Sequence, residues 1–181
     1  MNYSGLRTLQ STAVVLAALF TIGAKSELHD LIVYGQGFIF SVKEPPGWKG
    51  DTDNAQKFSS NLILYPESSS IEHAPAIIRI VIVDKTDERI GLDLDADMKG
   101  YRARFPNIRF ATLHVTHPAY ASVAKVFYLP GNFYEYVTYI NPGPSRKLMF
   151  SVAMNIHGRQ ANGAEMTAYR RCIASLDMLS R

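Results

Sequence analysis

The chain has 181 residues, of which 47% are hydrophobic, and it carries 19 basic against 16 acidic side chains. This apolar content, together with ten tyrosines, is typical of an ordered globular protein and excludes an intrinsically disordered chain. Its runs of Lys or Arg are no longer than two residues, so the sequence lacks the basic footprint of a nucleic-acid-binding protein.

The N-terminal segment has the order of regions found in secretory signal peptides. Arg7 supplies a positive charge, residues 13–22 (AVVLAALFTI) form an apolar run, and Ala24 and Ser26 are small residues placed as a cleavage site requires. The apolar run is shorter than the roughly 20 residues that span a bilayer. We therefore expect a signal peptide over residues 1–26, cleavage between Ser26 and Glu27, no stable membrane span afterwards, and an exported protein that is periplasmic or secreted.

Loss of the signal segment removes most of the net positive charge. Without Arg7 and Lys25, 17 basic groups remain against 16 acidic ones, so the net charge falls from +3 to +1. Residues 27–181 have the length of a single globular domain. Cys172 is the only cysteine, which excludes an internal disulfide, and we expect it to be a buried structural residue because free cysteine is among the most buried residue types.

Strand signals dominate the remaining chain. Residues 76–83 (AIIRIVIV) are apolar apart from Arg79, the pattern of an inner strand that is covered on both faces. Arg79 then needs a polar partner or a position at the sheet edge, because a buried unpaired charge is costly. Residues 130–132 (PGN) predict a tight hairpin connection. The expected strands are residues 37–42, 61–65, 76–83, 108–115, 120–129, 133–140 and 147–156.

Two segments have the spacing of amphipathic helices. The first covers residues 91–105 and ends at Pro106. The second covers residues 163–179, where Asn162 and Glu165 resemble a capping box. The apolar face of the first helix is Leu94, Met98, Tyr101 and Phe105; that of the second is Met166, Tyr169, Ile173 and Leu176, with Arg170, Arg171 and Asp177 facing solvent. The sum is an α+β fold, an antiparallel sheet of six or seven strands flanked by helices.

Three pieces of the chain occur in an order found in a known family. They are the strand and turn over residues 38–48 (FIFSVKEPPGW), the strand over residues 61–66 (NLILYP), and the strand that begins at residue 75 (PAII). With an antiparallel sheet and a closing C-terminal helix, this order resembles the PsbP-like domains, which share a fold with the Ran-binding Mog protein and include many uncharacterised exported bacterial proteins. The resemblance implies an α/β/α sandwich. It also implies an accessory or binding role, because photosynthetic members are accessory subunits and the Mog protein binds a partner.

Asp93, Asp95 and Asp97 resemble the opening of a calcium-binding loop. The pattern then fails, because Met98 stands where the loop needs glycine and Arg104 stands where it needs glutamate. Acids in the first turns of a helix also stabilise its positive N-terminal dipole. We interpret the three aspartates as structural.

The histidines do not have the spacing of a known metal motif. His114 and His117 are three residues apart, and an odd separation places side chains on opposite faces of a strand. We expect structural or exposed histidines, with a zinc or manganese site assembled from distant residues as the alternative. The five histidines are His29, His73, His114, His117 and His157.

Catalytic motifs are missing from the sequence, which has neither a G-x-S-x-G elbow nor a glycine-rich phosphate loop. We assign no catalytic residue, cofactor or metal. Tyr134 and Tyr136 share one strand face and Tyr128 lies across the hairpin, so these tyrosines form a candidate interface; sheet packing is the other interpretation.

The sequence thus favours an exported, non-enzymatic accessory or binding protein whose partner is another envelope protein. A hydrolase or metal-dependent enzyme with a site assembled from distant residues is the alternative.

Overall fold

A computed structural model of the protein describes residues 30–179. The predicted signal peptide, its cleavage point at Ser26 and Glu27, and His29 lie outside the described residues. Within residues 30–179, no helix combines the length and the apolar character that crossing a membrane requires. In chain order the elements are β1 (Asp30–Gly35), β2 (Phe38–Lys43), β3 (Trp48–Asp51), η1 (Ala55–Phe58), β4 (Leu62–Pro66), η2 (Ile71–His73), β5 (Ile77–Asp84), α1 (Gly91–Arg104), β6 (Arg109–Thr112), β7 (Ala121–Leu129), β8 (Phe133–Asn141), β9 (Leu148–His157), α2 (Gly163–Ser175) and β10 (Asp177–Met178).

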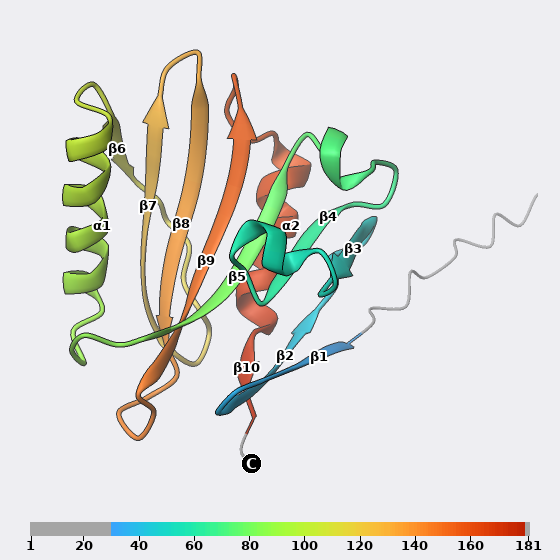
Figure 1. Ribbon diagram of the computed structural model, residues 1–181, viewed down its shortest axis with the longest axis vertical. Coiled ribbons are helices and arrows are strands. Elements are labelled where there is room, and N and C mark those ends of the chain that lie inside the picture. The colour runs from blue at the N-terminus through green and yellow to red at the C-terminus, as the bar shows by residue number, and fades with distance from the viewer. Residues whose placement is uncertain (1–29, 180–181) are drawn as a thin grey trace, which may run out of the picture.

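A seven-stranded antiparallel sheet forms the centre of the fold, in the order β3-β4-β5-β9-β8-β7-β6 (Figure 1). The predicted α+β class and the flanked antiparallel sheet are confirmed. β5 lies between β4 and β9, so the expectation that residues 76–83 form an inner strand is correct. β7 and β8 form the hairpin predicted at residues 130–132, where Gly131 has a φ of 76°, a value that favours glycine.

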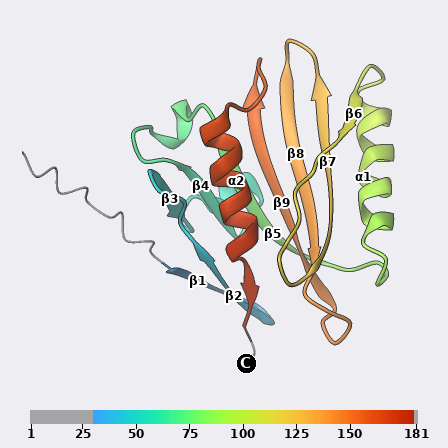
Figure 2. The ribbon, with the colours of Figure 1, turned by 180° about the vertical axis from the view of Figure 1, so that it is seen from behind.

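The two faces of this sheet carry different covers, because side chains alternate along each strand. α2 covers one face, where Phe150, Val152 and Met154 of β9 pack against Tyr169 and Ile173 of the helix (Figure 2). The opposite face carries α1, whose Leu94 packs with apolar residues of β7, β8 and β9. On that same face η1 covers the other end of the sheet, where its Ala55 packs against Ile63 and Tyr65 of β4.

A second, three-stranded sheet was not expected. Its order is β1-β2-β10, so the strand predicted at residues 37–42 pairs outside the main sheet. Phe40 and Val42 of β2 nevertheless enter the core beside α2. Figure 2 shows this small sheet and α2 on the same side of the molecule.

The predicted end of the C-terminal helix is wrong. The helix stops at Ser175, Leu176 is extended (φ −65°, ψ 131°), and Asp177 pairs with Ser41 as part of β10. Leu176 is buried, so its apolar character continued the helical pattern past the true end of the helix. The start of α2 is as predicted, because Asn162 and Glu165 form a reciprocal capping box.

Two other boundaries differ from expectation. The strand predicted at residues 108–115 is only four residues long, because Val115 leaves the sheet to join the core on the α2 side. Trp48, expected in a turn, begins β3 and is buried. The burial of one side chain also differs from expectation: Met166, predicted in the buried stripe of α2, is only partly buried.

Candidate ligand-binding cleft

A cleft of about 390 Å³ lies on the face of the main sheet that carries α1. The last turn of α1 and the start of β8 form one wall, and Phe58 of η1 stands on the other side. β5, β9 and β8, which are adjacent in the sheet, form the floor. In Figure 1, α1 and the short helix in front of β5 stand apart over this face, so the middle strands between them have no helical cover.

The floor of the cleft is polar although it lies in the middle of the sheet. Arg79 of β5 donates from Nη2 to Glu135 Oε1 of β8 at 2.8 Å, and from Nε to Asn155 Oδ1 of β9 at 2.8 Å. The Glu135 side chain is 5% exposed and that of Arg79 is 30% exposed. The polar partners that the sequence requires for Arg79 are therefore supplied by the adjacent strand β9 and by β8 beyond it, where neither α1 nor η1 covers the sheet.

Tyr101 completes this network from α1. Its hydroxyl donates to Glu135 Oε2, and its ring packs edge-on against Phe127. Burial, together with the negative charge of Glu135, raises the pKa of the Tyr101 hydroxyl well above its ordinary value. The hydroxyl therefore keeps its proton at neutral pH, and both oxygens of Glu135 accept hydrogen bonds from neighbouring side chains.

The walls of the cleft are aromatic. Phe105 and Phe133 contact each other with ring centroids 5.5 Å apart at an angle of 61°. Phe58 and Ile77, which pack with the η1 cluster, supply apolar surface on the opposite side. An apolar lining with a few convergent polar groups and a volume of a few hundred Å³ is the usual form of a small-molecule site.

Two basic residues stand at the rim. Arg104, at the end of α1, and His157, at the end of β9, line the cleft and are exposed. Within residues 30–179, neither side chain has a hydrogen bond or an ion pair to another residue. The two side chains are therefore available to a ligand.

The tyrosines predicted as an interface lie away from this cleft, on the α2 face. Tyr128 and Tyr134 are stacked across the hairpin, with centroids 5.4 Å apart and planes at 4°. Tyr136 is 7% exposed, and its hydroxyl accepts a hydrogen bond from the Ala161 amide at 2.8 Å. The interface role of the three tyrosines stays a prediction, for which the stacked pair offers the accessible surface.

The described histidines and aspartates are spread over the fold. Among residues 30–179, no group of three or more His, Cys, Asp or Glu side chains is placed to hold a metal ion. His117 is buried; its Nδ1 accepts from the amides of Ala119 and Tyr120, and its Nε2 donates to the Leu176 carbonyl at 2.9 Å. Asp97 accepts from the Tyr139 hydroxyl.

The remaining sequence-predicted positions are placed as follows. Asp93 and Asp95 lie in the first half of α1, His73 lies beside Ser70, and His114 is exposed on the connection after β6.

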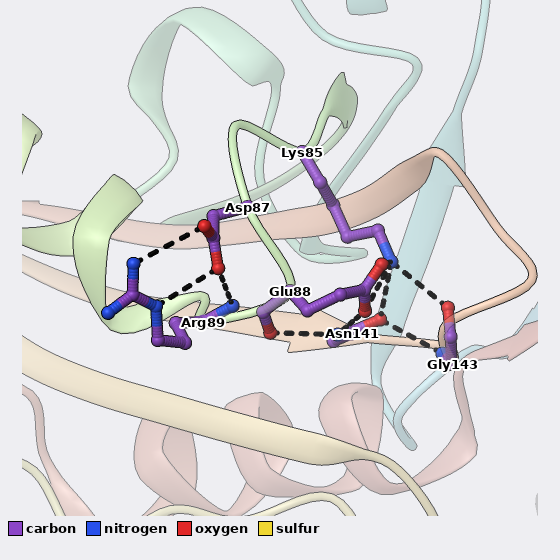
Figure 3. A network of polar contacts seen from close by, with 6 residues as sticks. All are labelled: Lys85, Asp87, Glu88, Arg89, Asn141 and Gly143. Atoms are coloured by element: carbon purple, nitrogen blue, oxygen red, sulfur yellow. Dashed lines mark hydrogen bonds and ion pairs between the residues drawn. The ribbon is translucent and has the colours of Figure 1, made fainter.

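A second polar network lies at the far end of β5 (Figure 3). The Lys85 side chain is 4% exposed, and its Nζ donates to both carboxylate oxygens of Glu88, to Asn141 Oδ1 and to the Gly143 carbonyl, at 2.9 to 3.2 Å. The contacts to Asn141 and Gly143 join the segment after β5 to the end of β8 and the connection that follows it, whereas those to Glu88 stay within the connection between β5 and α1. The hydrogen bonds of the Lys85 ammonium group are all made within the protein and link two parts of the fold, so we assign it a structural role.

Sequence reasoning identified Arg79 but missed Glu135, Tyr101 and Asn155. Glu135 carried a usable signal, because it is the one charged residue of its mainly apolar and aromatic strand, as Arg79 is within the apolar run over residues 76–83. Tyr101 was predicted as part of the apolar face of its helix, and nothing in its spacing indicates that its hydroxyl reaches a carboxylate.

The fold and the cleft together define an α+β sandwich with a small-molecule-sized cavity on one face of its sheet. A scan against known protein families finds no match, and no curated protein matches the sequence. A solved structure with a similar fold is LpqN, described as involved in cell envelope biogenesis of Mycobacterium tuberculosis. The likeness has a TM-score of 0.56 at 11% sequence identity, and covers 85% of this chain and 92% of that chain. At this identity it shows the fold alone, and the resemblance to PsbP-like domains is not confirmed.

Proposed function

We propose that the protein is an exported, non-enzymatic accessory protein of the cell envelope that binds a small, partly apolar ligand in the cleft beside α1. The observation that carries the proposal is an aromatic-walled cavity of about 390 Å³ whose floor is the Arg79–Glu135–Asn155 network. The fold likeness to a cell-envelope protein and the signal-like N-terminal segment both support an envelope location. Another envelope protein is the proposed partner.

The hydrogen bonds among the polar side chains of the cleft floor favour a binding role over a catalytic one. Both oxygens of Glu135 accept hydrogen bonds, and Tyr101 holds its proton. A general acid or base needs a proton that can move at the working pH. The alternative drawn from the sequence, a hydrolase or metal-dependent enzyme, has no specific observation in its favour among residues 30–179.

The cleft is tested with a neutral apolar dye whose fluorescence rises on binding, such as Nile red. We expect saturable binding to the full chain, weakened by Phe105→Ala on one wall and by Phe58→Ala on the other. Leu92→Ala is the matched control, because Leu92 is an exposed apolar residue of α1 that does not line the cleft. Dye binding that is absent, or that all three variants reduce equally, would overturn the proposal.

A further inference from the structure

The donors and acceptors of the cleft are unequally used. Arg79 donates from Nε and Nη2, while Nη1 has no partner among the residues that the structure describes. Asn155 accepts at Oδ1, and its Nδ2 has no partner among those residues either. The acceptors are used instead, because Glu135 accepts at both oxygens. The floor of the cleft therefore offers hydrogen-bond donors to a ligand.

The charges around the cleft also favour an anionic ligand. Among its lining residues Glu135 is the only acid, whereas Arg79, Arg104 and His157 are basic residues. Glu135 is already paired with Arg79, which leaves the rim residue Arg104 as an uncompensated positive charge. Paired donors beside positive charge are the arrangement that recognises an oxyanion.

The geometry limits the charge and shape of that anion. The Glu135 carboxylate, 2.8 Å from the Arg79 guanidinium, repels anions, and by Coulomb's law this repulsion is twice as large for a dianion as for a monoanion. The aromatic walls need an apolar body beside the anionic group, since Phe105 and Phe133 offer no hydrogen bonds from their side chains. A single charge on an apolar body describes a small organic carboxylate.

Resting on the proposed function, we infer that the ligand of the cleft is an amphipathic monocarboxylate. Its carboxylate is held by the free donors of Arg79 and Asn155, and its apolar body lies against Phe105 and Phe133. Arg104 attracts the anion at the rim.

The test compares phenylbutyrate with phenylbutanamide, which keeps the body and removes the charge, by calorimetry on the full chain at neutral pH. We expect the carboxylate to bind about tenfold more tightly or better, as a charged hydrogen bond to a guanidinium allows. Both compounds are also titrated against bound Nile red. Equal affinities with dye displacement would overturn the carboxylate inference and leave the binding cleft standing. Dye that does not bind, with neither compound binding, would overturn both.

Two sets of variants locate the recognition. The charge-neutral double variant Arg79→Gln with Glu135→Gln removes the guanidinium without leaving Glu135 unpaired, and it should abolish the preference for the carboxylate while still binding Nile red. A preference that survives in this variant would overturn the inference. Should the double variant not fold, Arg104→Gln is compared with Arg102→Gln, whose arginine lies over Phe110 outside the cleft.

We expect Arg104→Gln to weaken carboxylate binding about twofold to fivefold, as for an exposed charge, and Arg102→Gln to leave it unchanged. Equal affinities in these two variants would also overturn the inference.

Discussion

The hydroxyl of Tyr169 lies 2.9 Å from Thr138 Oγ1, in the fully buried layer between α2 and the main sheet. The same hydroxyl is within donating distance of the carbonyls of Tyr136 and Val152, at 2.8 and 3.0 Å. The helix is thus fixed to two adjacent strands by one polar atom in an otherwise apolar layer, and burial raises the pKa of that hydroxyl far above its ordinary value.

Tyr169→Phe should lower the free energy of unfolding by about 1–3 kcal/mol, because it leaves buried polar partners without their hydrogen bond. Thr138→Val removes the other hydroxyl and should cost less. Denaturant melts of the two single variants and the double variant measure the coupling, which we expect to be about 0.5–1.5 kcal/mol. Strictly additive effects would show that the two hydroxyls do not interact.

Ile173→Ala should destabilise the protein by about 2–5 kcal/mol, since Ile173 is fully buried against the sheet. Arg171→Ala, on the exposed side of the same helix, should change stability by no more than about 0.5 kcal/mol. Urea midpoints compare the two variants directly. Equal midpoints would mean that α2 does not pack on the sheet in solution.

Cys172 should resist thiol reagents in the native protein. Its side chain is fully buried, and burial raises the pKa of the thiol to about 12, so the reactive thiolate is scarce at neutral pH. Ellman's reagent should label one thiol per chain in denaturant and none in the folded protein over the same time. Cys172→Ser provides the blank, and rapid native labelling would contradict the burial.

The capping carboxylate of α2 should make stability depend on acid pH. Hydrogen bonds from Arg159 hold the pKa of Glu165 below its ordinary value of about 4.5, against the opposing effect of burial. A lowered folded-state pKa means that this contribution is complete above about pH 4.5 and is lost as the pH falls through the folded-state value.

Glu165→Gln should cost about 1 kcal/mol at neutral pH, as for a weakened cap. The difference in unfolding free energy between this variant and the wild type should shrink progressively below about pH 4.5. Thermal melts of both proteins across this range test it. A difference that stays constant down to the acid limit would show that the carboxylate charge is not the cause.

Export should leave a protein that begins at Glu27 or within a few residues of it. Intact-mass measurement of the chain expressed in a bacterium with a secretory pathway tests this prediction. Leu16→Arg interrupts the apolar run and should leave the precursor uncut in the cytoplasm. Wild-type protein recovered there with Met1 intact would count against the signal peptide.

Several parts of the fold follow from local patterns. The apolar run over residues 76–83 indicates an inner strand, and Pro106 marks the end of α1 closely. The small sheet does not follow in this way, because Asp177 and Met178 pair with residues more than a hundred positions earlier and carry no strand pattern of their own. Long-range pairing decided their conformation.

The cleft, like the fold, could be predicted from the sequence only in part. Arg79 is conspicuous because it interrupts an apolar strand, and its need for a partner can be stated from the sequence. Which partner it finds depends on strand order, since β9 separates β5 from β8 and Glu135 reaches Arg79 across it. Strand order was not predicted, so the cleft could not be.

The placement of β10 in the same sheet as β1 and β2 has a consequence for how the chain closes into its fold. The β1–β2 hairpin joins residues that are neighbours in sequence, whereas the third strand consists of residues 177 and 178. The core layer that joins Phe40 to Ile173 spans a similarly long stretch of chain. Closing so long a loop costs conformational entropy before its contacts form, so the small sheet and the α2 layer should be completed together, late in folding.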